Sequence, residues 1–268
     1  MLAFDRYAAA PPGDRPCVVL LHGVGGGRRI WDAAHGGFAA TLAAAGCSVL
    51  AFDLPGYGDS ALPAELSMPG MAQAVLDTLR VLRTGPVVLL GHSMGGMVAQ
   101  EILVQDPPAA CGLILTCTSP AFGSTAGDWQ AAFLRDRLAP LDAGQGMPAL
   151  ARRLVSAMVA PGASPLAVEQ GVEVMGRVPE ATYRAALRAL IGFDRRAALP
   201  QIAVPCLCLA AEQDRTAAPD VMQRMAQRIP GSAVQVLPGA GHLAHLEQPA
   251  AFAEAVIRFL QQHLWRST

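Results

Sequence analysis

The segment that decides the fold is residues 87–96, which read VVLLGHSMGG. Its four aliphatic residues predict a buried strand, and the glycines and serine that follow predict a sharp turn into a helix. A serine at such a turn has a strained backbone, and tiny residues two places before and after it prevent clashes across the turn. Gly91 and Gly95 meet this need around Ser93. We therefore interpret Ser93 as a candidate nucleophile between a strand and a helix.

Outward from this segment, short aliphatic runs alternate with longer helical patterns. The alternation predicts an α/β fold with a mostly parallel, doubly wound sheet that helices cover on both faces. Pro219 and Pro249 suit the starts of two helices, because a missing amide hydrogen costs little there. The expected strands are 18–22, 48–53, 87–91, 112–116, 205–210 and 233–237, and the expected helices include 68–83, 95–105, 219–228 and 249–263.

The alternation breaks in one long segment. Between residues 119 and 200 no convincing strand pattern occurs, and helical patterns rich in Ala, Arg and Leu are interrupted by Gly and Pro. This predicts a helical cap, residues 119–200, inserted between two strands of a core formed by residues 1–118 and 201–268. The segment before Val18 is short and rich in Pro, which leaves open whether the N-terminal edge strands are present.

A serine becomes a strong nucleophile beside a base, and the base needs a carboxylate to orient it. The expected strand 233–237 leads through a glycine-containing turn to His242, and the expected strand 205–210 leads to Asp214. Groups at the carboxyl ends of parallel strands gather at one edge of a sheet, so the three side chains should meet. We predict that His242 is the general base for Ser93 and that Asp214 orients it.

Other acids and histidines compete for these two roles. Glu212 is still close to its strand, and Asp220 falls in the first turn of a helix, where the helix dipole favours a carboxylate. His22 is expected to bond to the main chain beside the first loop, and His92 to point away from the pocket. His245 is expected either to line the site or to face solvent. No supporting motif surrounds the other two histidines, His35 and His263.

Attack by a serine on an acyl group creates an oxyanion, and main-chain amides are suitable donors to it. Met94 follows the serine at a helix N-terminus, and Val24 lies in the glycine-rich loop after the strand 18–22. We therefore assign Val24 and Met94 to substrate binding. The same loop fails as a dinucleotide fingerprint, because Arg28 stands where the last glycine belongs. We expect no nicotinamide site.

Composition excludes several other chemistries. The 268 residues carry a net charge of −1, so no strong field attracts nucleic acid or an anionic membrane. The sequence has no lysine, which rules out a Walker phosphate loop and a Schiff base. The six cysteines are scattered and resemble small buried residues rather than metal ligands or disulfides. Without a secretory or membrane-spanning stretch, we expect a cytoplasmic protein that needs no metal or cofactor, and its oligomeric state stays open.

Four ordered motifs give the chain a resemblance to the α/β-hydrolase superfamily. They are LHG at 21–23, FDLPGYGDS at 52–60, GHSMGG at 91–96, and GH at 241–242 with EQP at 247–249. Within the superfamily the chain resembles small bacterial esterases and lactonases related to 3-oxoadipate enol-lactonase, through GFDRR at 192–196 and the run to Val204 and Pro205. In the second motif, Asp53 is expected to tie down the turn around Gly56 and Gly58 rather than to touch substrate.

The resemblance implies a serine hydrolase that cleaves a small-molecule carboxylic ester or lactone through an acyl-enzyme. The same triad also serves hydrolases of carbon–carbon bonds in dienoate or β-diketone substrates and cofactor-free perhydrolases, so these activities stay open. A catalytically silent hydrolase fold that only binds ligands is the non-enzyme alternative. An intact set of Ser93, Asp214 and His242 argues against it.

The cap is expected to roof the pocket and to select what enters. Each of its candidate side chains has the alternative of packing in the core or facing solvent, so none is assigned to the substrate. The candidates are Phe122, Trp129, Phe133 and Met158 for apolar lining, and Arg135, Arg137, Arg152 and Arg153 for binding a substrate carboxylate.

Overall fold

The computed structural model describes residues 1–9, 15–32, 37–123 and 128–265. Within them seven strands form one sheet in the order β1-β3-β2-β4-β5-β6-β7. β1 pairs antiparallel with β3, and the other neighbours pair in parallel. The strands are β1 (Phe4–Tyr7), β2 (Val18–Leu21), β3 (Val49–Phe52), β4 (Val87–His92), β5 (Ala110–Thr116), β6 (Cys206–Ala211) and β7 (Ala233–Leu237).

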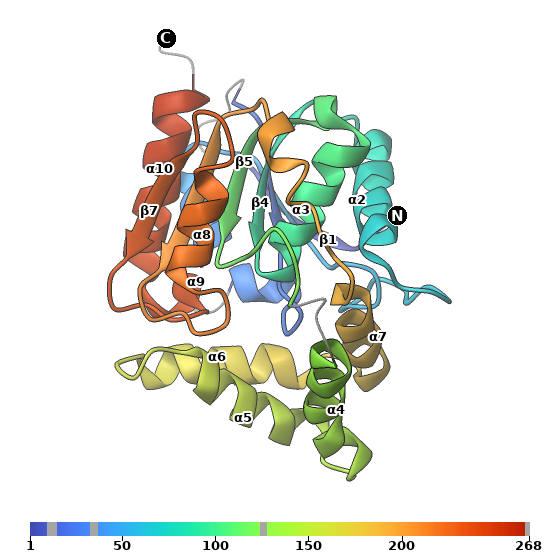
Figure 1. The fold of residues 1–268 in the computed structure, drawn as a ribbon. Coiled ribbons are helices and arrows are strands. Elements are labelled where there is room, and N and C mark those ends of the chain that lie inside the picture. The colour runs from blue at the N-terminus through green and yellow to red at the C-terminus, as the bar shows by residue number, and fades with distance from the viewer. Residues whose placement is uncertain (10–14, 33–36, 124–127, 266–268) are drawn as a thin grey trace.

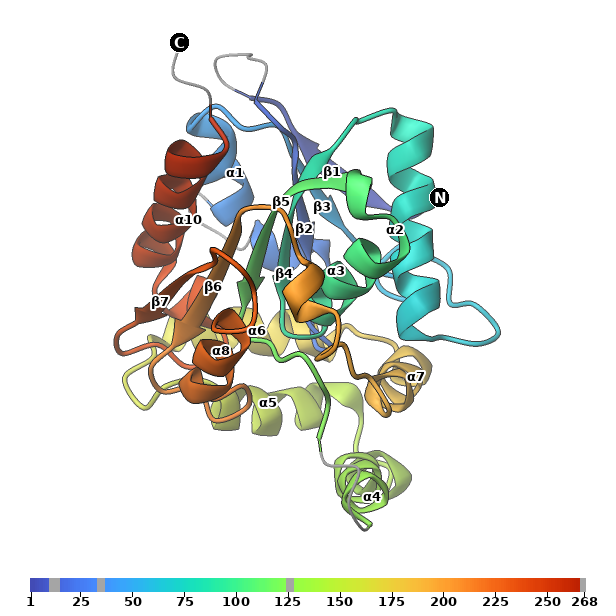
Figure 2. The same cartoon turned by 45° about the horizontal axis from the view of Figure 1, so that its top comes forward.

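Helices cover both faces of this sheet, which confirms the predicted doubly wound α/β fold. Figure 2 shows α1 and α10 on one face and α2, α3 and α8 on the other. No described helix combines the length and the apolar character that crossing a membrane requires. The helices around the sheet are α1 (Phe38–Ala44), α2 (Met68–Leu82), α3 (Met94–Gln105), α8 (Pro219–Ala226), α9 (Ala244–Glu247) and α10 (Pro249–His263).

The central strands are buried on both faces, as their continuous aliphatic runs predict. Every residue of β2 and of β4 is buried, including the aliphatic segment 87–90 that precedes the serine. Because helices exclude water from both sides, these strands form a rigid base. The turns at their carboxyl ends are therefore fixed in position.

The N-terminal segment supplies one edge strand, β1. Phe4 pairs opposite Phe52 of β3, and the two rings meet edge to face with centroids 5.6 Å apart. The main-chain amide of Leu2 also donates to Thr78 Oγ1 of α2 at 2.9 Å. The short segment before Val18 left open whether N-terminal edge strands are present. The structure shows one such strand, which is antiparallel to β3.

Four further helices follow β5 and precede β6 in the chain. They form a layer over the carboxyl ends of the strands, below the sheet in Figure 1. In the described part of residues 119–200 the β-structure consists of an isolated bridge between Ala121 and Asp194. We call these helices the cap: α4 (Trp129–Asp142), α5 (Met147–Met158), α6 (Pro165–Gly176) and α7 (Glu180–Leu190).

Candidate active site

Ser93 lies between β4 and α3 with φ 53° and ψ −119°, a conformation that L-residues rarely adopt. A Cβ atom on Gly91 would collide with the main chain of Gly95 and Gly96, so the turn requires glycine at this position, as predicted. A Cβ on Gly95 would instead collide with the carbonyl of Leu21 at the end of β2. Gly95 therefore permits the close packing of α3 on β2 rather than relieving the turn itself.

Hydrogen bonds to β5 and the residues after it hold the main chain of this serine. The amide of Ser93 donates to the carbonyl of Thr116 at 3.0 Å, and Thr118 Oγ1 donates to the carbonyl of Ser93 at 2.7 Å. The amide and the carbonyl of Ser93 are thereby bound to β5 and to the segment that follows it. The side-chain oxygen points into the cavity between the sheet and the cap.

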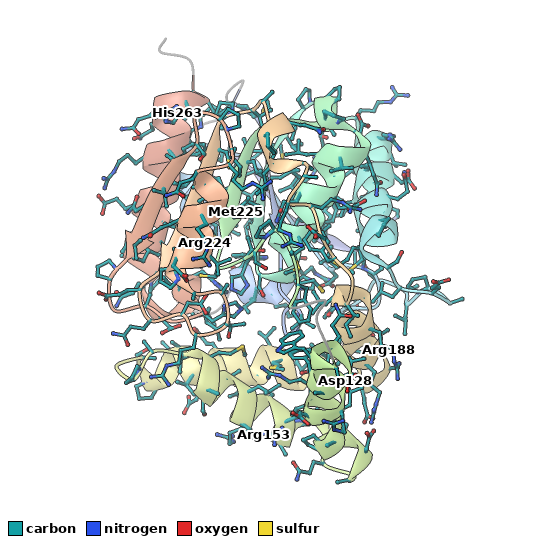
Figure 3. The ribbon with its side chains drawn as sticks, in the orientation of Figure 1. Asp128, Arg153, Arg188, Arg224, Met225 and His263 are labelled. Atoms are coloured by element: carbon teal, nitrogen blue, oxygen red, sulfur yellow. The ribbon has the colours of Figure 1, made fainter. Side chains whose placement is uncertain are left out.

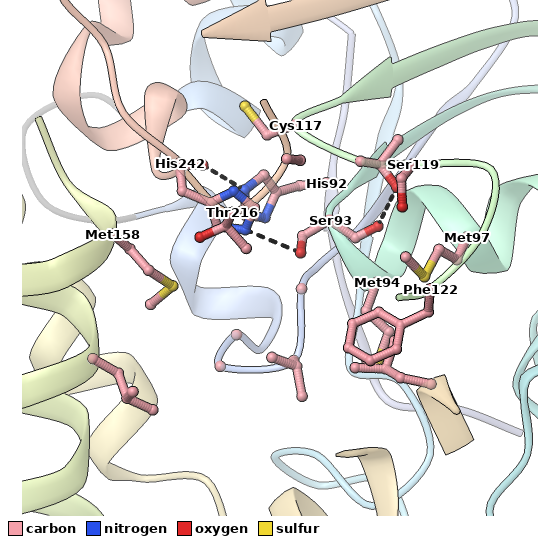
Figure 4. A pocket seen from close by; sticks show the side chains of 18 of the residues that line it. His92, Ser93, Met94, Met97, Cys117, Ser119, Phe122, Met158, Thr216 and His242 are labelled. Atoms are coloured by element: carbon pink, nitrogen blue, oxygen red, sulfur yellow. Dashed lines mark hydrogen bonds between the residues drawn. The ribbon is translucent and has the colours of Figure 1, made fainter. Parts of the chain in front are cut away.

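The structure brings Ser93, His242 and Asp214 into one hydrogen-bonded line. Figure 4 shows the part of this line that faces the cavity, the contact between His242 and Ser93. His242 Nε2 lies 3.0 Å from Ser93 Oγ, and His242 Nδ1 lies 2.8 Å from Asp214 Oδ2. Asp214 follows β6 and His242 follows β7, so the three groups come from separate strand ends, as expected from the parallel sheet. If Nδ1 carries its proton toward Asp214, Nε2 is free to accept the proton of the serine.

The hydrogen bonds around Asp214 favour the ionised form of its carboxyl. Its Oδ1 accepts hydrogen bonds from the main-chain amides of Thr216 at 2.7 Å and Ala217 at 2.9 Å. Burial raises the pKa of the Asp214 carboxyl, but the attraction of His242 and the hydrogen bonds from His242, Ala217 and Thr216 outweigh it, so the pKa is lowered overall. A buried carboxylate beside the imidazole stabilises the charge that His242 gains on taking a proton.

The carboxylate of Glu247, in the EQP motif, binds the loop that carries His242 to the cap. Glu247 accepts main-chain hydrogen bonds from Gly241 at 2.9 Å and Leu243 at 3.0 Å, on both sides of His242, and from Ala160 at 2.7 Å. The amide of His242 itself donates to the carbonyl of Met158 at 2.9 Å. The end of α5 and the histidine loop therefore form one hydrogen-bonded unit.

The structure gives the competing acids other partners. Glu212 accepts a hydrogen bond from the amide of Gly239, and Asp220 pairs with Arg224 on the surface of α8. Asp53 accepts from the amides of Arg28 and Asp59 and pairs with the Arg28 guanidinium. Asp53 therefore ties down the turn around position 58, as predicted.

The other described histidines are buried at the base of the site or lie far from it. His22 Nδ1 donates to the carbonyl of Gly23 at 2.8 Å, and His22 Nε2 accepts from the amide of Leu54 at 3.1 Å, as expected. His92 was predicted to point away from the pocket, but it is among the residues that line it. Its Nε2 donates to the carbonyl of His242 at 2.8 Å. His263 is exposed on α10 (Figure 3), and His35 lies outside the described residues.

His245 contradicts both alternatives that its position suggested. It neither faces solvent nor is one of the described residues that line the cavity, because its ring is buried between Trp31 and His92, with centroid distances of 4.9 Å and 4.8 Å. Burial lowers the pKa of His245 well below its usual value, lowers that of His92 to about 3 and lowers that of His22 to about 4. These three rings are neutral at physiological pH.

Comparison with known proteins places this arrangement in a family. A model described as the Alpha/beta hydrolase family matches residues 18–255. The chain belongs to the α/β hydrolase family. It is 29% identical over 279 residues to 2-succinyl-6-hydroxy-2,4-cyclohexadiene-1-carboxylate synthase of Salmonella schwarzengrund, covering 97% of this chain and 100% of that one.

Solved structures of other proteins superpose closely on this fold. A thermophilic esterase from Thermogutta terrifontis matches with a TM-score of 0.86 and 26% identity, over 97% of this chain and 93% of that one. The enol-lactonase from Burkholderia xenovorans matches with a TM-score of 0.85 and 22% identity, over 97% and 96% of the two chains. These matches confirm the α/β-hydrolase fold and the resemblance to small bacterial esterases and lactonases.

In an α/β hydrolase the two expected oxyanion donors should face the serine, and both predicted residues line the same cavity as Ser93. Neither the amide of Val24 nor that of Met94 has a hydrogen-bond acceptor within the described residues. Tyr57 Oη donates to the carbonyl of Val24 at 3.0 Å, which fixes the orientation of the loop at that point. The amides are thus available to a ligand at the serine.

The cavity between the sheet edge and the cap has a volume of about 570 Å³. The four predicted apolar residues of the cap all line it, but of the four candidate arginines only Arg137 does. Arg153, for example, is exposed on α5 (Figure 3). Lining residues that the sequence did not single out include Met97, Met175, Tyr183, Arg215, Thr216 and Leu243.

Three potential metal ligands also meet beside the serine. One donor atom each of His92, Cys117 and His242 lies within 4.8 Å of the others. Their spacing in the sequence gave no sign of such a group. His242 and His92 are already hydrogen-bonded, and burial raises the pKa of the Cys117 thiol well above its usual value. We assign no metal to this group.

Sequence reasoning missed two residues that the structure places at the site. Glu247 belongs to the EQP motif, and its fixed distance from His242 was the available signal for a carboxylate that binds the histidine loop. Tyr183 on α7 lines the cavity, and its only sequence signal is its place within the inserted segment.

Proposed function

We propose that this α/β hydrolase cleaves a carboxylic ester or a lactone by nucleophilic catalysis at Ser93. The observation that carries the proposal is the hydrogen-bonded line from Ser93 Oγ through His242 to Asp214 at the floor of the cavity. A strained serine at the N-terminus of α3, with a histidine in hydrogen-bond reach, matches the requirements of an activated nucleophile.

In the acylation step, Ser93 Oγ attacks the carbonyl carbon of the substrate while His242 Nε2 accepts the serine proton. The carbonyl oxygen gains the negative charge, and the amides of Val24 and Met94 are proposed to donate hydrogen bonds to it. Collapse of this intermediate breaks the bond to the alcohol oxygen. His242 returns its proton to that oxygen, which leaves as the alcohol and creates the acyl-enzyme.

In the second step, water enters beside His242, which removes a proton as the water oxygen attacks the acyl carbon. The same amides are proposed to stabilise the second oxyanion. The bond to Ser93 Oγ then breaks, and His242 gives the proton back to the serine. A carboxylic acid is released, and the resting protonation states return. Asp214 stays ionised in both steps and stabilises the imidazolium.

We further propose that residues 119–200 act as a cap that selects the substrate, while residues 1–118 and 201–268 form the catalytic core. The apolar cap side chains in the cavity support this division, because such lining favours substrates with apolar acyl or alcohol groups. Hydrolysis of a carbon–carbon bond is a second candidate, because the same set of serine, histidine and aspartate can serve it. A relative that is named as a synthase, the 2-succinyl-6-hydroxy-2,4-cyclohexadiene-1-carboxylate synthase, indicates that relatives of this chain are not restricted to ester hydrolysis.

The test is hydrolysis of p-nitrophenyl esters together with labelling by a fluorophosphonate. The wild-type protein should turn over the esters and be labelled at Ser93, and Ser93→Ala should lose both while keeping the fold. Ser119→Ala is the matched control, because Ser119 lines the same cavity and, among the described residues, its hydroxyl bonds to the carbonyl of Ala121 rather than to His242. Labelling at a different serine contradicts the assignment. Cleavage of ring-fission dienoates but not of esters favours the second candidate.

A further inference from the structure

Arg137 differs from the other half-buried arginines of the described chain. Arg28, Arg184 and Arg195 each form an ion pair with at least one carboxylate. Arg137, on α4, is also half-buried, yet no described carboxylate pairs with it. Its guanidinium lies 5.5 Å from the centroid of the Phe133 ring. Since partial burial of a charge without an anion is unfavourable, this guanidinium is available to an anionic ligand.

The position of Arg137 in the cavity supports a role in ligand binding. It follows Trp129 and Phe133 at intervals of four residues on α4, and all three line the cavity. The rings of Trp129 and Phe133 stack at 5.3 Å, and Phe122 meets Phe133 edge to face at 5.0 Å. One end of the cavity thus combines an aromatic surface with a single cation.

Tyr183 adds a second unused donor on this side of the cavity. Its hydroxyl has no hydrogen-bond partner among the described residues, although the side chain is buried and lines the cavity. Burial raises the pKa of Tyr183, with the nearby charges of Arg137 and Arg153 opposing the rise, so the hydroxyl remains protonated. A protonated phenol and a guanidinium together suit an acceptor with two oxygens.

The electrostatic character of the cavity agrees with an anionic ligand. No aspartate or glutamate is among the described residues that line it, whereas Arg215 is a second lining arginine, next to Asp214 in the chain. A neutral ester would leave Arg137 unpaired. A carboxylate, with its two oxygens and single negative charge, matches the guanidinium of Arg137 together with the hydroxyl of Tyr183.

We propose that Arg137 and Tyr183 bind a carboxylate on the substrate, so that the site prefers esters or lactones that carry a carboxylate on an apolar or aromatic body. This inference rests on the proposed hydrolase function and narrows its substrate class. The carboxylate would be held under the cap while the reacting carbonyl meets Ser93. The apolar chain between them would cover the aromatic rings of the cap.

The experiment compares p-nitrophenyl pentanoate with p-nitrophenyl hydrogen glutarate, in which a carboxylate replaces the terminal methyl group. Wild-type kcat/KM should favour the glutarate. Arg137→Gln should lower the ratio of the two kcat/KM values by about 10-fold to 100-fold, and Tyr183→Phe by about fivefold, as expected for loss of a charged and of a neutral hydrogen bond. Arg135→Gln is the matched control, because Arg135 is exposed on the same helix and does not line the cavity.

Equal turnover of both esters by the wild type would overturn the inference while leaving the hydrolase function intact. An equal fall of the ratio in Arg135→Gln would also overturn it, because only the general charge of the helix would then matter. A binding measurement keeps the inference testable if no ester is cleaved. By calorimetry, phenylacetate should bind more tightly than phenylacetamide, and Arg137→Gln should abolish the difference. Tighter binding of phenyl phosphate would contradict the assignment to a carboxylate.

Discussion

The cavity has a floor at the strand ends, formed by Ser93 and His242 with Asp214 behind them, and a roof formed by cap residues such as Arg137 and Tyr183. The polar side chains of the floor have hydrogen-bond partners within the described chain, whereas those two of the roof do not. On the floor, His242 bonds to Ser93 and Asp214, and Asp214 is saturated by two further main-chain amides. On the roof, Arg137 and Tyr183 have no anionic or hydrogen-bonding partner within the described chain. The hydrogen-bonded line from Ser93 to Asp214 is complete without a ligand, whereas the amides of Val24 and Met94 and the two roof groups are available to one. In the function that we propose, this division separates the chemistry from the choice of substrate.

The largest expected effect on kcat comes from removing the carboxylate of Asp214, which bonds to His242. Asp214→Asn places an amide beside His242 Nδ1 and favours the wrong tautomer, so kcat should fall by about 10⁴-fold with a smaller change in KM. Steady-state kinetics on one ester measures this. Glu212→Gln and Asp220→Asn are the controls, and both should be mild because neither carboxylate reaches His242. A crippled Glu212→Gln enzyme would show that the acid is misassigned.

A smaller effect is expected where floor and roof are joined. Glu247→Gln replaces one oxygen that accepts main-chain hydrogen bonds by an amide group that donates, so the histidine loop and the end of α5 should separate. Misplacement of His242 by about 1 Å should lower kcat by about 10²-fold, with KM changing less.

Hydrogen exchange of segments 158–160 and 241–243 in the Glu247→Gln protein gives an independent measurement, and both segments should exchange faster together. Glu254→Gln is the matched control, because Glu254 is exposed on α10 and its described partner is Arg258 of the same helix. If exchange rises in one segment alone, Glu247 does not couple the cap to the histidine loop.

Acid should destabilise the floor more than the roof, because the buried histidines lie below the cap. The pKa of His22 is lowered to about 4 and that of His92 to about 3, so between these values and about 6.5 the unfolded chain binds more protons than the folded one. The contribution of these two histidines to the free energy of unfolding is therefore complete above about pH 6.5, and it is lost as the pH falls. Each of these histidines should raise the unfolding constant by about 30-fold at about pH 5.

Denaturant unfolding at several pH values measures this loss. His22→Gln should flatten the dependence on pH, whereas His263→Gln should leave it unchanged because His263 is exposed. No histidine occurs in residues 119–200, so the cap adds no histidine to this dependence on pH. An unfolding free energy that is the same at about pH 5 and about pH 7.5 would contradict the neutral state of the buried rings.

The smallest effect is expected from the apolar part of the roof. Trp129→Ala removes a ring that is 41% exposed and stacked on Phe133, so the fold should be little affected. For esters with long apolar acyl chains, kcat/KM should fall by about tenfold, and for an acetate ester it should stay near the wild-type value. An equal loss on both esters would place Trp129 in the catalytic floor rather than in the roof.

Local sequence was sufficient to place the serine between a strand and a helix, to suggest its partners and to predict a mostly parallel sheet. The informative patterns were aliphatic runs that end at glycine-flanked turns. Such patterns are local, so they can be recognised without knowing which strands pair. Because parallel strands end at a common edge, Asp214 and His242 could be expected beside Ser93 although they are far apart in the chain. Strand β1 escaped detection because three half-buried residues and one exposed residue make a weak pattern that only pairing with β3 stabilises.

What only the tertiary structure decided is which side chains of the helices face the cavity. Arg135, Arg137, Arg152 and Arg153 look alike in the sequence, yet only Arg137 lines the cavity, because the packing of α4 against α7 sets which side of the helix turns inward. His245 and Glu247 likewise depend on what surrounds them, the first being enclosed by Trp31 and His92, the second meeting Ala160 of a distant segment. Sequence periodicity defines the faces of a helix, but the direction in which a face points is a property of the assembled core.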